Sequence, residues 1–533
     1  MFDWGRTLEL KALYAAVFGP DYRFDHDHHH VSTRPAGLLR IMEVVKNDLG
    51  FLLLNAVAAT PAADHPAYAG SGAEWDVTYH LFQLESHQRL QVHLLYRHGD
   101  VIPSVRDLYP PAARAEAEAL ARVRGVAPAV AAPLEMPVPP GNVNLSEPPL
   151  PHELHQWFLF DLLHPMMRGE AELALETDEG RVLRAWYHTG HWRRGWESRA
   201  HAWTPLQAAT LLEGLHPQAV PLTAVAWSKT VEDYFRWRVP ERAQAIRMVF
   251  MELGRAHHHV GVLARLAADL GQPEAVQACR EVVERLRHLF RLYSGARMVC
   301  GPGGFGGLTH DLPPGWTQEC ASTVQALQAL AKLYLKLVLR NPLHQRRLGG
   351  AAISAHQALQ AGLTGPALRA TGVNFDLRKS RPFYFYTDID FEVPVGVRGA
   401  THDRALVLCE EIVQAARIAA QVMDNLPLGA VQADAAGLDE FNRGVLPPAV
   451  WEQWCREADR AFGGQWTAVE GPDGELGFHA VLHPSRAELW SLHVKTGGSW
   501  TAQAVPVVLT GCPLPEVATA LTSLALTASA VDR

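Results

Sequence analysis

Polar and apolar residues alternate along residues 75–112, most clearly in WDVTYHLF and RLQVHLLY. Alternation with a period of two predicts two paired strands, here followed by a loop and a short helix. The stretch GLLRIMEVVKNDL at 37–49 has helical spacing and precedes the strands. Together these elements predict a small α+β domain in the N-terminal part of the chain.

Regular patterning stops in residues 124–151, RGVAPAVAAPLEMPVPPGNVNLSEPPLP. Proline at this density cannot build a core and favours an extended linker. We therefore expect one domain at 1–123 and another at 152–533, joined by a protease-sensitive segment at 124–151.

Beyond the linker, apolar residues recur every three or four positions in four long segments, at 239–271, 273–295, 322–342 and 401–426. This spacing predicts helices that pack on one another as a bundle. Alternation around 170–188 predicts a strand pair before the bundle, and the last seventy residues, from 464 onward, return to strand alternation. The predicted fold class is α+β: a small α+β domain, then a mainly helical domain flanked by small β elements.

The net charge of −8 argues against the clustered basic surface that binds nucleic acid, so we expect no nucleic-acid partner. The opening segment MFDWGRTLEL lacks the basic and apolar regions of a secretory signal. No apolar run approaches the roughly 18 residues that would suggest a membrane span. We therefore expect a peripheral protein without a transmembrane segment.

The six cysteines, at 279, 300, 320, 409, 455 and 512, include no close pair. Iron–sulfur, zinc-ribbon and nickel–iron centres need thiolates at short spacing, so we expect no metal or other cofactor in this chain. The glycine-rich segments lack both the Gly-Lys-Ser/Thr ending and the dinucleotide-binding context. The chain itself is therefore expected to bind no nicotinamide.

Three histidine-rich segments are candidates for metal sites. DHDHHH at 25–30 has densely spaced donors, but its place near the terminus favours a solvated loop. Residues 257–259 are three histidines on a predicted helix, where they face three directions and cannot bind one ion. His188 and His191 are interpreted as packing or hydrogen-bonding groups rather than ligands.

Several motifs in the helical part are specific, namely VPERAQAIRMVFMELGR (239–255), GLTGPALRATGVNFDLRKSRPF (362–383) and DFEVPVGVRGATHDR (390–404). On these motifs, residues 155–533 resemble the large quinone-site subunit of respiratory complex I, a relative of nickel–iron hydrogenase large subunits. Residues 75–112 resemble, more weakly, the small hydrophilic subunit that some bacteria fuse in front of it. The resemblance implies a hydrogenase large-subunit-like fold for 152–533.

The loop HPMMRG, which starts at His164, matches the family's His-Pro loop. The family's second loop histidine, which lies against the quinone head group, falls on Arg168. Its quinone-contacting tyrosine falls on Pro217, and the aspartate that pairs with the histidine is kept as Asp269. Arginine, with a pKa above about 12, cannot act as a general acid, and proline has no side-chain donor. The resemblance thus implies a quinone loop that has lost its proton donors.

Three further positions can be compared with the family, and two of them, Arg194 and Val299, correspond to residues beside the iron–sulfur cluster of its partner subunit. Arg194 is retained there, Val299 stands in place of a histidine, and Gly304 stands in place of an arginine. At the quinone loop, Asp269 is kept although its histidine partner has become Arg168. We therefore expect a guanidinium–carboxylate contact between them of about 2.7–3.2 Å.

The resemblance implies a subunit that acts only within a membrane-attached, complex I-related oxidoreductase. It would lie on the cytoplasmic side of the inner membrane, against an iron–sulfur subunit and beside ion-translocating membrane subunits. Quinone chemistry is expected to be altered or lost. Quinone, or another electron acceptor, remains a candidate ligand near His164, Arg168 and Asp269. NAD would bind elsewhere in the complex. The alternative is a purely structural and coupling subunit, without a substrate, of an ion-translocating complex related to energy-converting hydrogenases.

Overall fold

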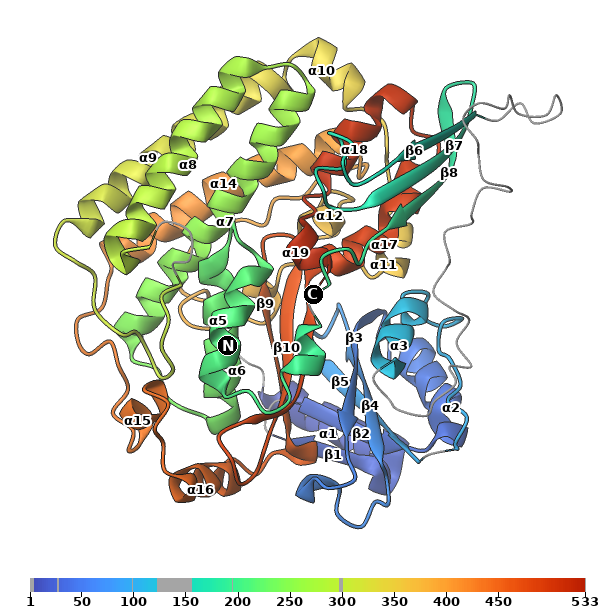
Figure 1. The fold of residues 1–533 in the computed structure, drawn as a ribbon, viewed down its shortest axis with the longest axis vertical. Coiled ribbons are helices and arrows are strands. Elements are labelled where there is room, and N and C mark those ends of the chain that lie inside the picture. Colours follow the sequence, from blue (N-terminus) through green and yellow to red (C-terminus); the bar gives the residue numbers. More distant parts are fainter. Residues whose placement is uncertain are drawn as a thin grey trace.

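A computed structural model describes residues 4–25, 28–97, 99–121, 156–193, 195–296 and 301–532 (Figure 1). The predicted linker at 124–151, together with Arg194 and Val299, lies outside these described residues. Within them, the first part of the chain is an α+β unit and the second is a helix bundle with two small sheets. The predicted fold class is confirmed.

The N-terminal unit is built on a five-stranded sheet with the order β1-β2-β5-β4-β3. Its strands are β1 (Tyr22–Asp25), β2 (His28–Thr33), β3 (Leu53–Pro61), β4 (Trp75–Phe82) and β5 (Arg89–Tyr96), and its helices are α1 (Trp4–Phe18), α2 (Leu38–Glu43) and α3 (Ala112–Leu120). β2 runs parallel to β5, and the other neighbours are antiparallel. The predicted strand pair is β4–β5, and the predicted helix before it is α2, so both predictions are confirmed.

Strand β2 shows that the expectation of a solvated loop was wrong for His28, His29 and His30, the described histidines of the segment 25–30. His28, His29 and His30 belong to β2, with exposed fractions of 7%, 0% and 3%. β2 lies between two other strands, and the ring of Phe462, from the far end of the chain, lies 5.8 Å from the ring of His30 between centroids. These histidines are buried because distant segments cover them, which local composition does not indicate.

Four long helices form the bundle, and their bounds are α7 (Glu241–Asp269), α8 (Pro273–Ser294), α9 (Trp316–Tyr334) and α14 (Thr401–Asp424). α7 is central, because it contacts α6 (Val220–Phe235), α8 and α14, and it is buried around nearly its whole circumference. α8 instead buries one stripe of residues at helical spacing, from Ala275 to Tyr293, and ends at Gly295 in the left-handed conformation. The predicted bundle is confirmed.

Shorter helices connect and cover the bundle. Before it lie α4 (Trp196–Arg199), α5 (Pro205–Leu212) and α6 (Val220–Phe235); between α9 and α14 lie α10 (Pro342–Arg347), α11 (Ala355–Gln360), α12 (Gly365–Arg369) and α13 (Leu377–Ser380); after α14 come α15 (Leu438–Asn442) and α16 (Pro448–Ala458). α5 begins with a capping box, in which the Thr204 hydroxyl accepts from the Gln207 N–H and the Gln207 side chain accepts from the Thr204 N–H.

The second part contains two antiparallel sheets of three strands each. One is formed by β6 (Gln156–Phe160), β7 (Glu172–Asp178) and β8 (Arg181–His188), and the other by β9 (Gly464–Glu470), β10 (Glu475–Leu482) and β11 (Leu489–Lys495). The strand pair predicted around 170–188 is therefore present as β7–β8, with β6 added at its edge.

The last seventy residues are strands only as far as Lys495, so the expectation for the remainder was wrong. From Gly497 the chain forms α17 (Gly497–Leu509), α18 (Val517–Ser523) and α19 (Ala528–Val531). α17 contacts β8, and α18 contacts both α7 and α14. A segment buried on several sides lacks the polar positions that distinguish a helical pattern from a strand pattern.

The two parts of the chain meet at a buried carboxylate, Glu475 on β10. Its Oε2 accepts from Asn55 Nδ2 and Lys495 Nζ, each at 2.7 Å, and its Oε1 accepts from Arg89 Nη2 at 2.9 Å. Asn55 and Arg89 belong to the N-terminal sheet, which lies beside β10 in Figure 1. Because an unpaired buried charge is strongly destabilising, this cluster holds the N-terminal sheet against the C-terminal strands.

Across the described ranges, none of the helices combines the length and the apolar character that a bilayer crossing requires.

Candidate functional site

The HPMMRG loop connects β6 to β7 and is ordered by its own hydrogen bonds. Asp161 Oδ1 accepts from the backbone N–H groups of Leu163 and His164, each at 2.9 Å. The His164 ring lies 4.8 Å from that of Phe160, and its Nδ1 accepts from the Met166 N–H at 3.3 Å. His164 itself is exposed. The sequence-predicted loop histidine is thus present at the surface, with its Nδ1 occupied by the loop backbone.

Arg168 contacts Asp269, as the sequence predicted. Its Nη2 lies 3.0 Å from Asp269 Oδ1 and 3.2 Å from Oδ2. Its Nη1 donates to Thr522 Oγ1 at 3.1 Å, and the Thr522 hydroxyl donates to Asp269 Oδ2 at 2.6 Å. One guanidinium nitrogen therefore serves both carboxylate oxygens while the other binds Thr522. The three side chains join the loop, the end of α7 and α18.

This contact lies at the surface rather than in the core, since the side chains of Arg168 and Asp269 are 29% and 18% exposed. Solvent screens such a pair. We expect Arg168→Ala to lower the free energy of unfolding by only about 1 kcal/mol, not by the 3–5 kcal/mol of a buried pair. Urea unfolding of the two proteins measures this difference, and a loss as large as that of a buried pair would contradict the prediction.

Pro217 has no side-chain group that could donate a proton at the HPMMRG loop. It is exposed, in the turn before α6. The preceding residue, His216, is buried, and its Nε2 lies 3.1 Å from Asp473 Oδ1, while Asp473 Oδ2 accepts from the Gly498 N–H at 2.8 Å. His216 was not predicted from the sequence, because its carboxylate partner lies 257 residues further along the chain.

A buried ion network occupies the interior between α7, α12, α14 and β9. Arg369 pairs with Glu411 Oε1 and with Glu470 Oε1, each at 2.6 Å, and these three side chains are at most 1% exposed. Arg378 pairs with Asp376 at 2.7 Å and with Glu252 at 2.9 Å. Arg369, Asp376 and Arg378 come from the motif 362–383, and Glu252 comes from 239–255. Two of the motifs on which the family resemblance rests therefore supply four of these six side chains.

Two of the three consecutive histidines of α7, His258 and His259, extend the network, and His257 binds a backbone oxygen outside it. His259 Nε2 lies 2.9 Å from Glu411 Oε2, His258 Nδ1 lies 3.4 Å from His259 Nδ1, and His257 Nδ1 lies 2.6 Å from the Gln218 carbonyl oxygen. Burial alone would raise the pKa of Glu411, but Arg369 and the His259 hydrogen bond lower it below its ordinary value. The carboxylate therefore stays charged inside the protein.

A second group of buried histidines lies where the N-terminal sheet meets the C-terminal strands. His93 connects Asp76 Oδ2, at 2.7 Å from its Nδ1, with His30 Nδ1, at 2.9 Å from its Nε2. His80 stacks on Trp466 at 4.3 Å between ring centroids and lies 4.8 Å from the ring of His479. This group was not predicted from the sequence, because its members come from β2, β4, β5 and β10.

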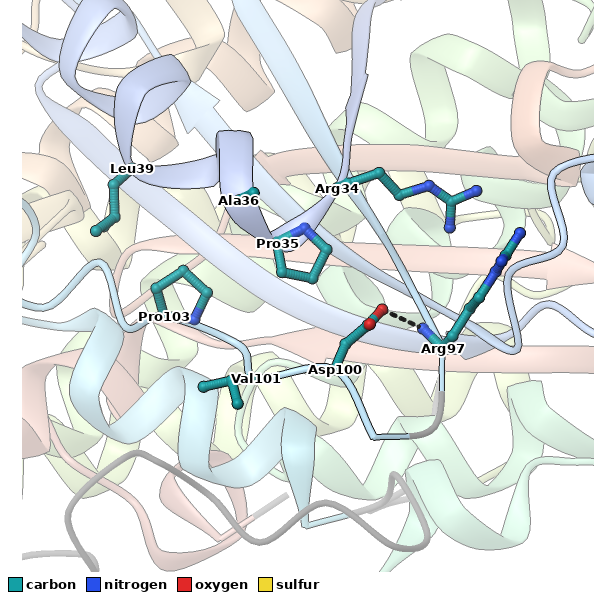
Figure 2. A pocket seen from close by; sticks show the side chains of 8 residues that line it. All are labelled: Arg34, Pro35, Ala36, Leu39, Arg97, Asp100, Val101 and Pro103. Atoms are coloured by element: carbon teal, nitrogen blue, oxygen red, sulfur yellow. Dashed lines mark hydrogen bonds between the residues drawn. The ribbon is translucent and has the colours of Figure 1, made fainter.

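A hollow of about 690 Å³ lies on the surface of the N-terminal unit (Figure 2). Two arginines, Arg34 and Arg97, stand along one side of it, and Asp100 accepts a hydrogen bond from the Arg97 N–H at 2.9 Å. Both guanidinium groups donate to backbone carbonyl oxygens of the loop at 71–72. The residues lining the hollow all lie between 34 and 103, so it includes no residue that the resemblance places at the quinone site.

These features define a class of protein: a two-part α+β chain in which a helix-bundle domain holds a His-Pro loop through the contact of Arg168 with Asp269. The family model of the respiratory-chain NADH dehydrogenase 49 Kd subunit matches residues 269–533, and that of the 30 Kd subunit matches residues 31–121. The chain belongs to the family of the 49 Kd subunit, and a domain of the 30 Kd family precedes that part.

Named relatives agree with this assignment. An NADH-quinone oxidoreductase subunit of the C/D type from Bdellovibrio bacteriovorus is 30% identical over 390 residues, which are 69% of this chain and 67% of the relative. One of the D type from Desulforamulus reducens is 31% identical over 65% of this chain and 93% of its own length. The NADH-ubiquinone oxidoreductase 49 kDa subunit of Cafeteria roenbergensis is 28% identical over 69% of this chain and 94% of its own.

Proposed function

We propose that this chain is a subunit of a complex I-related oxidoreductase in which the ordinary protonation of quinone has been lost. The observation that carries the proposal is the contact of Arg168 with Asp269 and Thr522, at the position of the family's loop histidine. A guanidinium stabilises a negative charge, but it releases no proton near neutral pH. Quinone reduction needs two protons, and a site without donors cannot supply them locally.

The surroundings of the loop support the same proposal. Pro217, at the position of the family's tyrosine, is exposed and has no side-chain donor. His216 beside it is buried and faces Asp473, not the loop. His164 is the one imidazole among the described residues of the HPMMRG loop, and a backbone N–H occupies its Nδ1. Within this loop, any remaining proton transfer by an imidazole would depend on His164.

The assembly is also a proposal, and it rests on family membership and on the names of the relatives as subunits. We place the chain against an iron–sulfur subunit, near Arg194 and Val299, and beside ion-translocating subunits on the cytoplasmic side of the inner membrane. Electrons would pass through the partner's cluster, because the described residues offer no paired thiolates to hold one.

The test is Arg168→His in the assembled complex, assayed with its own electron donor and a short-chain quinone. We expect both the wild type and the variant to be inactive, since Pro217 and Val299 still lack proton donors. Arg168→Lys is the matched control, because lysine keeps the positive charge without the planar fork that binds Asp269 and Thr522 together. A wild-type complex that reduces quinone at a rate abolished by Arg168→Ala would refute the proposal.

The alternative, a structural and coupling subunit without a substrate, is supported by the elements that Arg168 joins. Its contacts fix the HPMMRG loop to the end of α7 through Asp269 and to α18 through Thr522. Photoreactive quinone labelling of the assembled complex separates the two candidates. Labelling near His164 that excess quinone prevents would favour a modified quinone site, whereas absence of specific labelling would favour the structural role.

A further inference from the structure

We propose that Glu172, His188 and His191 form a binding site for a first-row divalent transition metal, of which zinc is the representative. One ligand atom from each of the three side chains lies within 4.8 Å of the other two. The set comes from two strands and the loop that follows them. It is separate from the Arg168 contact and does not depend on the proposed function.

Strand register brings two of the ligands together. Glu172, the first residue of β7, pairs directly with His188, the last residue of β8, in the antiparallel ladder. Directly paired residues place their Cβ atoms about 4.5–5.5 Å apart on the same face of the sheet. A carboxylate and an imidazole therefore stand side by side at the end of the strand pair.

The loop after β8 adds the third ligand. Gly190 has a φ of +112°, a conformation that L side chains rarely adopt, and it turns the chain directly before His191. The rings of His188 and His191 lie 5.1 Å apart between centroids at an interplanar angle of 78°. His191 Nε2 lies 3.9 Å from Glu172 Oε2. His188 and His191, at the spacing His-x-x-His, thus lie beside the carboxylate of Glu172 on the neighbouring strand.

A buried carboxylate outside the set holds this loop in place. Asp532, 5% exposed, accepts from the Gly190 N–H through Oδ1 at 2.6 Å and from the Trp192 N–H through Oδ2 at 2.9 Å. The indole of Trp192 donates to the Gly169 carbonyl oxygen at 2.6 Å, which ties the loop to HPMMRG. The backbone on both sides of His191 is therefore fixed, independently of the three proposed ligands.

Among the described residues, none of the three side chains forms a hydrogen bond with a group outside the set. Neither imidazole makes a hydrogen bond to a described group, and the 3.9 Å approach of His191 to Glu172 is too long for one. Zinc binds imidazole and carboxylate at about 2.0–2.2 Å, so modest rotations of these solvent-facing side chains would complete coordination. Three protein ligands leave a fourth position open to water or another ligand.

The donor set also selects the class of ion. Calcium and magnesium prefer oxygen ligands throughout, whereas two imidazoles and one carboxylate suit zinc and its neighbours in the first transition row. The expectation of a metal-free chain rested on cysteine spacing, which says nothing about histidine ligands assembled by strand pairing. In this proposal His188 and His191 are metal ligands, in place of the packing or hydrogen-bonding role that the sequence suggested.

The experiment is a calorimetric titration of the purified full chain with zinc chloride at pH 7, followed by the visible spectrum of the cobalt(II) form. We expect one equivalent of zinc to bind. Loss of a group that only supports a metal ligand weakens binding by roughly 10- to 100-fold. Each of the variants His188→Ala, His191→Ala and Glu172→Gln removes a ligand itself and should therefore weaken binding by more than this. His356→Ala, which removes an exposed histidine on α11, should leave affinity unchanged.

A measurement on the unaltered chain covers the case in which a variant fails to fold. Zinc should protect His188 and His191 from modification by diethyl pyrocarbonate, as mapped by mass spectrometry, while His356 is modified equally with and without the ion. Absence of stoichiometric binding, binding that all three substitutions leave intact, or equal modification of His188 and His191 with and without zinc would each overturn the proposal.

Discussion

Arg369→Met is expected to lower the free energy of unfolding by about 3–5 kcal/mol, because it removes the cation that two buried carboxylates share. Arg369 lies 2.6 Å from both Glu411 and Glu470, and all three side chains are buried. The hydrophobic replacement fills similar space, so the loss comes from the two charges that remain uncompensated rather than from a cavity.

The measurement is urea unfolding of the variant and the wild type at pH 7. Arg443→Met is the matched control, since Arg443 lies 3.9 Å from Asp439 with both side chains largely exposed, at 65% and 83%. A surface substitution of this kind should change stability by less than about 0.5 kcal/mol. If Arg369→Met lost no more than the control, the network would not contribute to the stability of the fold.

Acidification below about pH 6.5 is expected to destabilise the protein through its buried histidines. Burial lowers the pKa of His29 to about 4 and that of His479 to about 3. The pKa values of His28, His30 and His80 also lie well below the ordinary value, with burial again the largest cause. The native protein therefore keeps these imidazoles neutral in mild acid.

The direction of this change in stability with pH follows from proton uptake. The unfolded chain binds protons at these histidines once the pH falls below about 6.5, while the native protein does not, so stability is complete above that pH and decreases below it. Each such histidine contributes up to about 1.4 kcal/mol per pH unit. For His29 the loss continues to a pH of about 4, and for His479 to about 3.

The variant His80→Phe tests whether the buried histidines cause the loss of stability in acid. It keeps a flat ring against Trp466 and removes the titrating group. Neither ring nitrogen of His80 has a hydrogen-bond partner among the described residues, so no bond is lost. Unfolding at a series of pH values should give a shallower decline between pH 6.5 and 5, by about 1 kcal/mol per unit on average and by at most about 1.4 kcal/mol per unit. The exposed His356→Phe should leave the slope unchanged, and an unchanged slope in His80→Phe would contradict the attribution.

Part of the candidate site could be foreseen from the sequence, but only through the family resemblance. The spacing between Arg168 and Asp269, 101 positions, contains no local signal for a contact. Thr522 completes the contact from 354 positions away and was not foreseen. From the sequence, Arg369 was only part of a family motif, Glu411 part of a predicted helix and Glu470 part of a predicted strand region, because residues in three separate segments show no pairing in a linear pattern.

The sequence by itself determined several of the local elements of this protein. Period-two alternation placed β4 and β5, and three- and four-residue spacing placed the long bundle helices, because side-chain periodicity reflects the geometry of the backbone. Tertiary structure alone decided which polar groups are buried. His28 to His30 became core residues when neighbouring strands and Phe462 covered them, and residues 497–531 became helices packed against β8 and the bundle. Burial depends on what the rest of the chain places against a segment, and local patterning does not contain that information.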